Sequence, residues 1–423
     1  MPKENEKQRI FTRRAVIFGG LQLAAFSLLA GRLGYLQFIK AREFTTLSEN
    51  NRIKLQLIAP ERGRILDRCG VPMALNQKNY RLFIDYSGLT QSAFRATVAR
   101  LHELLPLPEK KLRQLQTTRV SSAAMPELIR EHLAWEEVAL IELHMLELPG
   151  VTIDIGQIRH YPFVDQAAHL IGYVGTVAEE DLSGQNDEAL MRLPDFRIGK
   201  NGVEKALEDQ LRGTAGIRSL EVNVHGVPVR EVSRKESVPG ENMRLTIDSR
   251  LQSYAAGLVA QESAGVVVME VETGNVLALV SMPGFDPDIF STGITADYWK
   301  ELSGDKKGPL LNKAISGQYP PGSTFKMMVG LAGLSAGVIS PSSVINCPGQ
   351  FFLGDHKFQC WKQGGHGSVH FREAIQQSCD VFFYTVAERL GIDPYAKMAR
   401  EFGLGQLHDL GIVGEKPGII PDA

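Results

Sequence analysis

The stretch QYPPGSTFKMMVG, residues 318–330, places a serine directly after Pro-Pro-Gly and a lysine three positions later. Because proline and glycine are costly inside a helix, we expect a helix that begins at or beside Ser323 and ends at Gly337. Its first turn offers free backbone N–H groups to a developing negative charge, and Lys326 lies on the same face as Ser323. The pattern predicts either a serine nucleophile beside a lysine base or an N-cap serine beside a solvated lysine.

A second segment, AIQQSCDVFFYTVAERL at 374–390, is an apolar helix interrupted by Ser378-Cys379-Asp380. Enzymes with a serine–lysine pair commonly take a second serine and a polar third residue from another element. Ser378 would then pass a proton between Lys326 and a leaving amine, while Asp380 would orient the substrate or the lysine. Serine and aspartate are also common at helix ends, so the segment alone leaves both interpretations open.

The composition of the 423-residue chain is that of a globular protein with two or three domains: 43% hydrophobic, 22% charged, net charge −2. Nothing in this charge balance indicates a nucleic-acid partner. One stretch, AVIFGGLQLAAFSLLAG, is uncharged and follows several basic residues, which predicts a transmembrane helix over 15–40 with a cytoplasmic tail at 1–14. A cleaved signal peptide is the competing interpretation, but no small-x-small site interrupts the run before Leu33.

Downstream of this stretch the pattern mixes helices and strands. Residues 45–240 contain short segments, among them helical patches with apolar residues three and four apart. A helix is expected to begin near Ser249. The segment AGVVVMEVETGNVLALVSMPG at 264–284 predicts a β-hairpin that turns at its central Thr-Gly-Asn. These runs predict an α+β fold.

Five segments in order along the chain resemble class B penicillin-binding proteins, most closely the penicillin-binding protein 2 type. The resemblance implies a pedestal (dimerisation-type) domain over 45–240 and a transpeptidase domain of the penicillin-binding/β-lactamase-like fold over 241–423. The segments are ERGRILDRCGVPMA (61–74), RHYPFVDQAAHLIGYVG (159–175), GKNGVEKALEDQLRG (199–213), MPGFDPDIF (282–290) and NKAISGQYPPGSTFK (312–326).

The resemblance also implies the chemistry of a peptidoglycan D,D-transpeptidase of cell elongation. Ser323 would attack the bond between the terminal D-alanines of a stem peptide, with Lys326 as general base and Ser378 assisting proton transfer. Penicillins would acylate Ser323. Asp380 stands where many relatives carry asparagine. The implied location is the bacterial inner membrane, with most of the chain periplasmic, beside a SEDS-class glycosyltransferase and rod-system proteins.

The third family motif, Lys-Thr-Gly, is not found in the sequence. Lys416-Pro417-Gly418 does not replace it, since proline supplies neither a hydroxyl nor an N–H, and we expect a C-terminally truncated form. One alternative is therefore a catalytically inert anchor-plus-pedestal binding module. Another is a β-lactam sensor or hydrolase, although the long pedestal and the lack of a deacylating base argue against it.

Three cysteines and one histidine lie close together in the sequence, in the segment that ends beside Ser378: Cys347, Cys360, His366 and Cys379. Three thiolates and an imidazole complete a tetrahedral zinc shell, which predicts a structural zinc that positions Ser378. By resemblance, some relatives carry zinc at these positions. A Cys347–Cys360 disulfide with Cys379 buried is the alternative. Other possible ligands are Asp355, His356 and His370.

Three further polar residues belong to the segments of the resemblance. His160 and His169 are interpreted as packing and hydrogen-bonding residues of the pedestal. Glu204 either connects the pedestal to the catalytic domain or lies on a solvated helix face.

Overall fold

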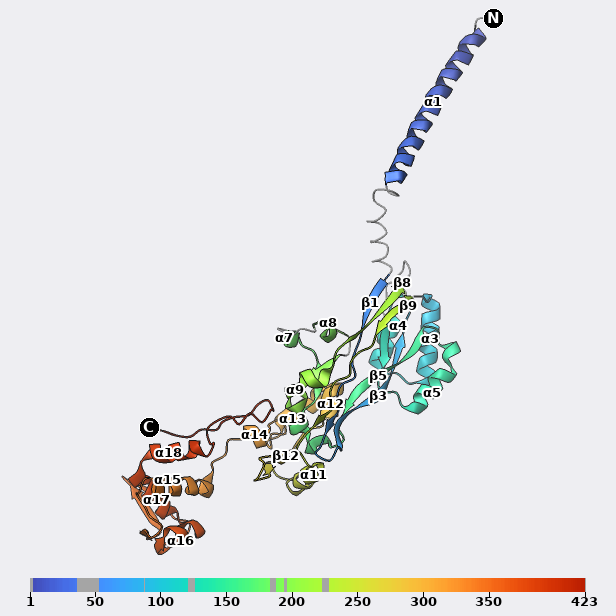
Figure 1. The fold of residues 1–423 in the computed structure, drawn as a ribbon. Helices are drawn as coiled ribbons and strands as arrows, with labels where there is room; N and C mark the ends of the chain where they lie inside the picture. Colours follow the sequence, from blue (N-terminus) through green and yellow to red (C-terminus); the bar gives the residue numbers. More distant parts are fainter. Residues whose placement is uncertain are drawn as a thin grey trace. The chain divides into compact units, whose positions relative to one another are not determined.

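The computed structural model describes residues 3–35, 53–86, 88–120, 126–182, 188–193, 196–222 and 228–422 (Figure 1). Helices and mostly antiparallel strands alternate along the chain, so the α+β prediction is confirmed. The chain divides into two compact units. The first comprises Met1–Glu61 and Gly213–Pro239, and the second comprises Arg62–Arg212 and Gly240–Ala423.

The first unit holds one long helix and a three-stranded antiparallel sheet. Helix α1 spans Lys3–Gly34, and the sheet has the order β1-β8-β9. Of the helices that the structure describes, none is long and apolar enough to cross a membrane. The expected span over 15–40 lies partly outside the described residues, because residues 36–40 are not among them. The strands are β1 (Ile53–Ile58), β8 (Gly216–Val222) and β9 (Pro228–Lys235).

The second unit begins with a sheet built on one long strand, β3 (Pro72–Ile84), which pairs with β5 (Val151–His160) over ten residues. Three helices lie beside this pair (Figure 1) and bury a continuous apolar core with it, because their apolar residues recur at helical spacing. The neighbouring elements are β2 (Ile65–Leu66), β4 (Glu127–Arg130), β10 (Met243–Arg244), α3 (Gln91–Leu104), α4 (Glu109–Thr117) and α5 (Trp135–Leu143).

Short elements follow β5, and one of them carries the buried carboxylate of Glu204. Glu204 in α9 is fully buried and lies 2.7 Å from both Arg62 and Arg159. Because Glu204 is fully buried, the interpretation that it lies on a solvated helix face is wrong. Both arginines precede residue 240, so these two ion pairs do not test whether Glu204 connects the pedestal to the segment after it. The turn η2 (Met145–Glu147) precedes β5, and the elements that follow β5 are η3 (Val164–Gln166), α6 (Ala168–Ile171), β6 (Val174–Thr176), α7 (Glu179–Leu182), α8 (Glu188–Met191), β7 (Arg197–Gly199), α9 (Gly202–Ala206) and α10 (Glu208–Arg212).

The predicted helix and hairpin after residue 240 are both present. Helix α11 starts at Ser249 because the Asp248 carboxylate caps the N–H groups of its first turn. The hairpin pairs β11 and β12 in antiparallel register. His160 Nδ1 forms a hydrogen bond with Asp288 Oδ2, and the two atoms are 2.7 Å apart. The elements are α11 (Ser249–Leu258), β11 (Ala264–Met269), β12 (Val276–Met282), α12 (Pro287–Thr292), α13 (Ala296–Gly304) and α14 (Lys313–Ser316).

The C-terminal segment packs its helices around an apolar cluster that includes three cysteines. Two glycines of α15 permit close packing: a Cβ at Gly330 would lie 2.7 Å from the Phe371 ring, and one at Gly333 would lie 2.8 Å from Val386. The elements are η4 (Gly322–Phe325), α15 (Lys326–Ser335), β13 (Val344–Cys347), β14 (Gln350–Leu353), β15 (His356–Gln359), β16 (Gly367–His370), α16 (Phe371–Gln376), α17 (Asp380–Leu390) and α18 (Ile392–Glu401).

Candidate functional site

Ser323 lies where the sequence predicts, at the start of a helical segment. It belongs to the 3-10 turn η4, which continues directly into α15 at Lys326. Gly322 adopts φ +57°, a conformation that glycine reaches without strain. The Ser323 residue is exposed, so it is accessible from solvent.

A chain of hydrogen bonds joins Ser323 to Lys326 through Ser378. Ser378 Oγ donates to Ser323 Oγ at 2.9 Å, and Lys326 Nζ donates to Ser378 Oγ at 3.0 Å. Between Ser323 and Lys326, both within the described part of the chain, the structure has no direct side-chain hydrogen bond. Ser378 is therefore the link between the candidate nucleophile and the amine.

Asp380 holds the lysine in this arrangement. Lys326 Nζ donates to Asp380 Oδ1 at 2.5 Å and to the Ser378 carbonyl at 2.9 Å. The side chains of Lys326 and Asp380 are 14% and 20% exposed, so the ion pair is only partly screened by water. As the first residue of α17, Asp380 also places its carboxylate at the positive end of a helix.

Ser378 occupies a turn in an uncommon conformation. It has φ +51°, which is rare for a residue with a side chain, and it lies between α16 and α17. A non-glycine residue in this region costs about 1–3 kcal/mol and persists where its surroundings fix it. The adjacent Cys379 is fully buried, and its backbone N–H donates to the Ala374 carbonyl at 2.9 Å. Fixed in this way, the turn directs the Ser378 hydroxyl toward Ser323.

Trp361 contacts the same turn and was not anticipated from the sequence. Its backbone N–H donates to Asp380 Oδ2 at 3.0 Å, and its indole Nε1–H donates to the carbonyls of Gln377 and Ser378 at 3.0 and 3.2 Å. The one available signal was its place directly after Cys360, an expected metal ligand. That adjacency did not reveal which groups the indole would contact.

The four expected metal ligands lie together beside this turn. The ligand atoms of Cys347, Cys360, His366 and Cys379 are all within 4.8 Å of one another. His366 Nδ1 lies 3.7 Å from Cys347 Sγ and 3.5 Å from Cys360 Sγ. A tetrahedral zinc with its usual bond lengths separates a sulfur from a nitrogen ligand by about 3.6 Å. The spacing of these atoms therefore fits a metal of this kind.

The electrostatics of the cluster vary from ligand to ligand. Burial raises the pKa of the Cys379 thiol to about 12. Burial also acts on Cys360, but hydrogen bonds from the backbone N–H groups of Lys362, Asp380 and Val381 outweigh it and lower the pKa of that thiol. Burial lowers the pKa of His366, which favours the neutral imidazole that binds metals. A divalent cation among these groups would favour the thiolates further.

The alternatives for these residues are not supported. All four cysteines are free thiols, so the Cys347–Cys360 disulfide is absent. The group that could hold a metal does not include Asp355, His356 or His370, which are exposed. Cys69 is exposed in a turn of the second unit, apart from the cluster.

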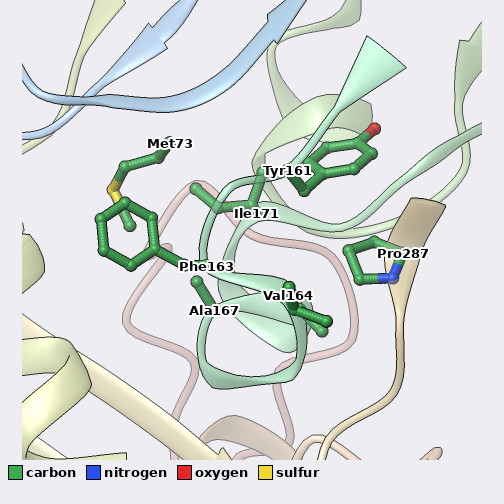
Figure 2. Close-up of a pocket in the computed structure, with 8 residues that line it drawn as sticks. Met73, Tyr161, Phe163, Val164, Ala167, Ile171 and Pro287 are labelled. Carbon is green, nitrogen blue, oxygen red and sulfur yellow. The ribbon is translucent and has the colours of Figure 1, made fainter. Parts of the chain in front are cut away.

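A small hollow elsewhere in the second unit is lined mostly by apolar side chains, unlike the polar group around Ser323 (Figure 2). The Tyr161 hydroxyl at its edge accepts a hydrogen bond from the Val174 N–H at 2.9 Å. None of the residues around Ser323 lines it, and its walls carry neither a charge nor a nucleophile. The lining residues are Met73, Tyr161, Phe163, Val164, Ala167, Ala168, Ile171 and Pro287.

Comparison with known proteins matches both halves of the chain. The sequence model of the Penicillin-binding Protein dimerisation domain matches residues 57–245, and that of the Penicillin binding protein transpeptidase domain matches residues 264–423. The peptidoglycan D,D-transpeptidase MrdA of Acinetobacter baumannii is 36% identical over 422 residues, which cover 99% of this chain and 62% of the relative. The chain thus spans less than two thirds of the length of that relative.

Solved structures give the same result. A complex of the penicillin-binding protein PBP2 with MreC from Helicobacter pylori has a TM-score of 0.77 and 28% identity, covering 88% of this chain and 69% of that chain. A peptidoglycan synthase complex that coordinates polymerization and crosslinking has a TM-score of 0.67 and 28% identity, covering 97% and 70%. With both domain types matched in order along nearly its whole length, the chain belongs to the class B penicillin-binding proteins of the PBP2 (MrdA) type, a family of serine-type peptidoglycan D,D-transpeptidases.

Proposed function

We propose that this chain is a peptidoglycan D,D-transpeptidase that cross-links stem peptides during cell elongation through an acyl-enzyme at Ser323. One observation carries the proposal: the hydrogen-bonded series Ser323 Oγ, Ser378 Oγ and Lys326 Nζ, with the lysine held by Asp380. A hydroxyl linked to an amine through a second hydroxyl has a route for its proton and can act as a nucleophile. The known chemistry of the family supports the same reaction.

In the proposed reaction, Ser323 Oγ attacks the carbonyl carbon between the two terminal D-alanines of a stem peptide. Because hydroxyl hydrogens rotate freely, Ser323 then donates to Ser378, which passes its own proton to Lys326 Nζ. For this step the Lys326 ammonium first gives up one proton, and the Asp380 carboxylate that it contacts is the adjacent acceptor. That proton leaves with the amine of the released D-alanine, and an ester links the peptide to Ser323. An amine of a neighbouring stem peptide attacks this ester, forms the new amide and returns a proton to Ser323.

Asp380 has a positioning role in this scheme. It holds Lys326 Nζ 3.0 Å from Ser378 Oγ, the distance at which proton transfer takes place. The strained φ of Ser378 serves the same end, since another conformation of the turn would redirect its hydroxyl.

Labelling with a fluorescent penicillin tests the proposal, because the β-lactam resembles the D-Ala-D-Ala end and acylates the same serine. The folded 423-residue chain should retain the label through denaturing electrophoresis, and Ser323→Ala should abolish it. Thr324→Ala is a matched control, since Thr324 is the neighbouring hydroxyl and its Oγ1 bonds only the Pro321 carbonyl among the described contacts.

Three results would contradict the proposal. Label retained by Ser323→Ala would place acylation on another residue. A folded chain that takes no label would instead favour the anchor-plus-pedestal binding module, with the catalytic segment inert. Rapid loss of the label would indicate a hydrolase in place of a transpeptidase.

We further propose that Cys347, Cys360, His366 and Cys379 hold a structural zinc ion. Three thiolates and one imidazole fill a tetrahedral shell, which leaves no position for substrate and excludes a direct catalytic role. Cys379 precedes the first residue of α17 and Cys360 precedes Trp361, so the ion would fix both segments that contact Ser378.

Metal analysis tests this assignment. The purified chain should contain about one zinc, and Cys360→Ser should lose it, whereas Cys69→Ser should retain it because Cys69 lies outside the cluster. An equal metal content in all three proteins would contradict the assignment.

The proposed setting follows the family. We place the chain in the bacterial inner membrane through residues 15–40, with a cytoplasmic tail at 1–14, a pedestal over 45–240 and the transpeptidase segment over 241–423. The H. pylori complex of PBP2 with MreC supports a rod-system partner, and the synthase complex that coordinates polymerization and crosslinking supports a polymerising partner. The family resemblance implies that the polymerising partner is a SEDS-class glycosyltransferase. Co-purification of these partners with the full chain, lost when residues 45–240 are deleted, would test the setting.

A further inference from the structure

Trp361 combines two properties that rarely occur together. Its side chain is 65% exposed, yet both of its N–H groups donate hydrogen bonds to one short turn. An exposed indole can satisfy its N–H with water, so packing does not require this arrangement. The acceptors are instead specific: the carbonyls of Gln377 and Ser378 and the Asp380 carboxylate.

These three acceptors surround the proton route. The Ser378 carbonyl accepts from both Trp361 Nε1 and Lys326 Nζ, at 3.2 and 2.9 Å. The two Asp380 oxygens are divided between the same two residues, with Oδ1 bonded to Lys326 and Oδ2 bonded to Trp361. Trp361 and Lys326 therefore donate hydrogen bonds to the same two groups, the Ser378 carbonyl and the Asp380 carboxylate.

The turn needs such support because Ser378 has φ +51°. Relaxation to an ordinary φ would rotate the Ser378 carbonyl away from both donors and move its hydroxyl from Ser323. The backbone of Trp361 is fixed in turn, because Cys360 before it is buried in the cysteine–histidine cluster and His366 contacts the indole ring edge-on, 5.5 Å between centroids.

We propose that Trp361 is a positioning residue that keeps Ser378 and Asp380 in the geometry required for acylation of Ser323, through hydrogen bonds from its indole and backbone N–H groups. The inference rests on the proposed function, since it concerns the proton route of that same site. It adds a residue outside the Ser323–Lys326–Ser378–Asp380 set, and it gives the exposed indole a role in orientation that needs no contact with substrate.

Trp361→Phe tests the inference, because it retains an aromatic ring and removes the indole donor. Acylation by a fluorescent penicillin should slow about tenfold, the effect of losing one or two net hydrogen bonds of ordinary strength. The loss should fall on the maximal acylation rate and leave the affinity of the non-covalent complex unchanged. Trp135→Phe is the matched control, since Trp135 is also 65% exposed and lies in α5, far along the chain from this site.

A closer substitution separates the N–H from ring shape. Benzothienylalanine has sulfur in place of the indole N–H, and it can replace tryptophan in a Trp135→Phe/Trp299→Phe background that leaves Trp361 as the sole tryptophan. It should reproduce the tenfold loss of Trp361→Phe. The proposal would be overturned if the chain with this analogue were acylated at the full wild-type rate. It would also be overturned if a lower melting temperature of Trp361→Phe fully accounted for its slower acylation.

Hydrogen exchange keeps the inference testable even where penicillin labelling fails. Peptides that cover residues 376–380 should exchange faster in Trp361→Phe than in the wild-type chain, because the turn loses its support. If the wild-type chain takes no label while residues 376–380 still exchange faster in Trp361→Phe than in the wild type, the proposed function is contradicted and the positioning role of Trp361 is retained. Unchanged exchange at 376–380 would overturn the positioning role whatever the labelling result.

Discussion

Two clusters of charged residues in the second unit use the same chemistry to different ends. Around Glu204, two arginines contact a fully buried carboxylate at 2.7 Å, and Tyr161 and Glu208 extend the network. Around Lys326, the ion pair with Asp380 is partly open to solvent. Lys326 also donates to Ser378 Oγ, which in turn donates to Ser323 Oγ. The first cluster has its partners within the pedestal segment, and the second lies beside Ser323, the exposed candidate nucleophile.

The difference lies in what each network leaves free. In the buried cluster the Glu204 carboxylate is shared between two guanidinium groups, so its removal leaves charges stranded without solvent. In the exposed cluster Ser323 remains accessible and Ser378 is held in a strained conformation. Backbone strain beside an accessible hydroxyl at one site, against full burial of a carboxylate at another, is typical of the division between function and stability.

Lys326→Met should give the largest effect on activity. Loss of the amine removes the proton acceptor of the proposed route, so penicillin acylation should fall by about 10²–10⁴-fold. The melting temperature should change little, because the Asp380 carboxylate left behind is 20% exposed and still accepts a hydrogen bond from the Trp361 N–H. Stopped acylation with an unchanged melting curve is the expected pair of results, and Lys397→Met, on an 80% exposed side chain, is the control. A large loss of stability would make the site resemble the Glu204 cluster and break the comparison.

Glu204→Gln should show the opposite pattern. Removal of one partner from a buried ion cluster costs about 3–5 kcal/mol, because the remaining charges stay buried without compensation. Urea unfolding should therefore give a much lower midpoint. Chains that remain folded should still take up penicillin at Ser323 at close to the wild-type rate.

The control for this change is an exposed ion pair of the same type. Glu109→Gln removes the partner of Arg113, and both side chains are more than three-quarters exposed. It should change stability by less than about 1 kcal/mol. Equal effects of the two substitutions would show that burial does not distinguish the clusters.

The sequence predicted the exposed cluster better than the buried one. Ser323, Lys326, Ser378 and Asp380 stand in short motifs whose spacing reflects their chemistry, and the structure brings all four together. The four metal-ligand candidates, Cys347, Cys360, His366 and Cys379, also meet. Residue type alone indicated these positions as metal ligands, because cysteine and histidine are infrequent in this chain.

The buried cluster and Trp361 depend on distant pairings that local patterns do not contain. Glu204 meets Arg62 across 142 positions and Arg159 across 45. No periodicity within a segment indicates which of many arginines will lie inside, and the interpretation that Glu204 lies on a solvated helix face was wrong. Trp361 likewise finds its acceptors 16 and more positions away, through a turn whose conformation the sequence did not reveal.

A third carboxylate, Asp67, is intermediate and yields the smallest and most pH-dependent prediction. It is 2% exposed, and it has no ion-pair partner in the described part of the chain. Burial alone would raise the pKa of Asp67, but a hydrogen bond from the Ser249 hydroxyl and others from the N–H groups of Val71, Ser249 and Cys69 lower it. Asp67→Asn should therefore cost about 1.5–3 kcal/mol at neutral pH, the usual value of hydrogen bonds to a charged group.

The sign of the pH dependence follows from that depressed pKa. The folded state favours ionised Asp67, so its stabilisation is present above the ordinary pKa of aspartate and is lost as the pH falls through the folded value. Urea midpoints of the wild-type chain and Asp67→Asn should converge as the pH is lowered from 7 toward 3. A constant difference across this range would mean that shape, not charge, makes Asp67 stabilising. Convergence would instead set Asp67 beside Glu204, as a buried carboxylate that supports the fold, and apart from Asp380, which contacts the lysine beside the candidate nucleophile.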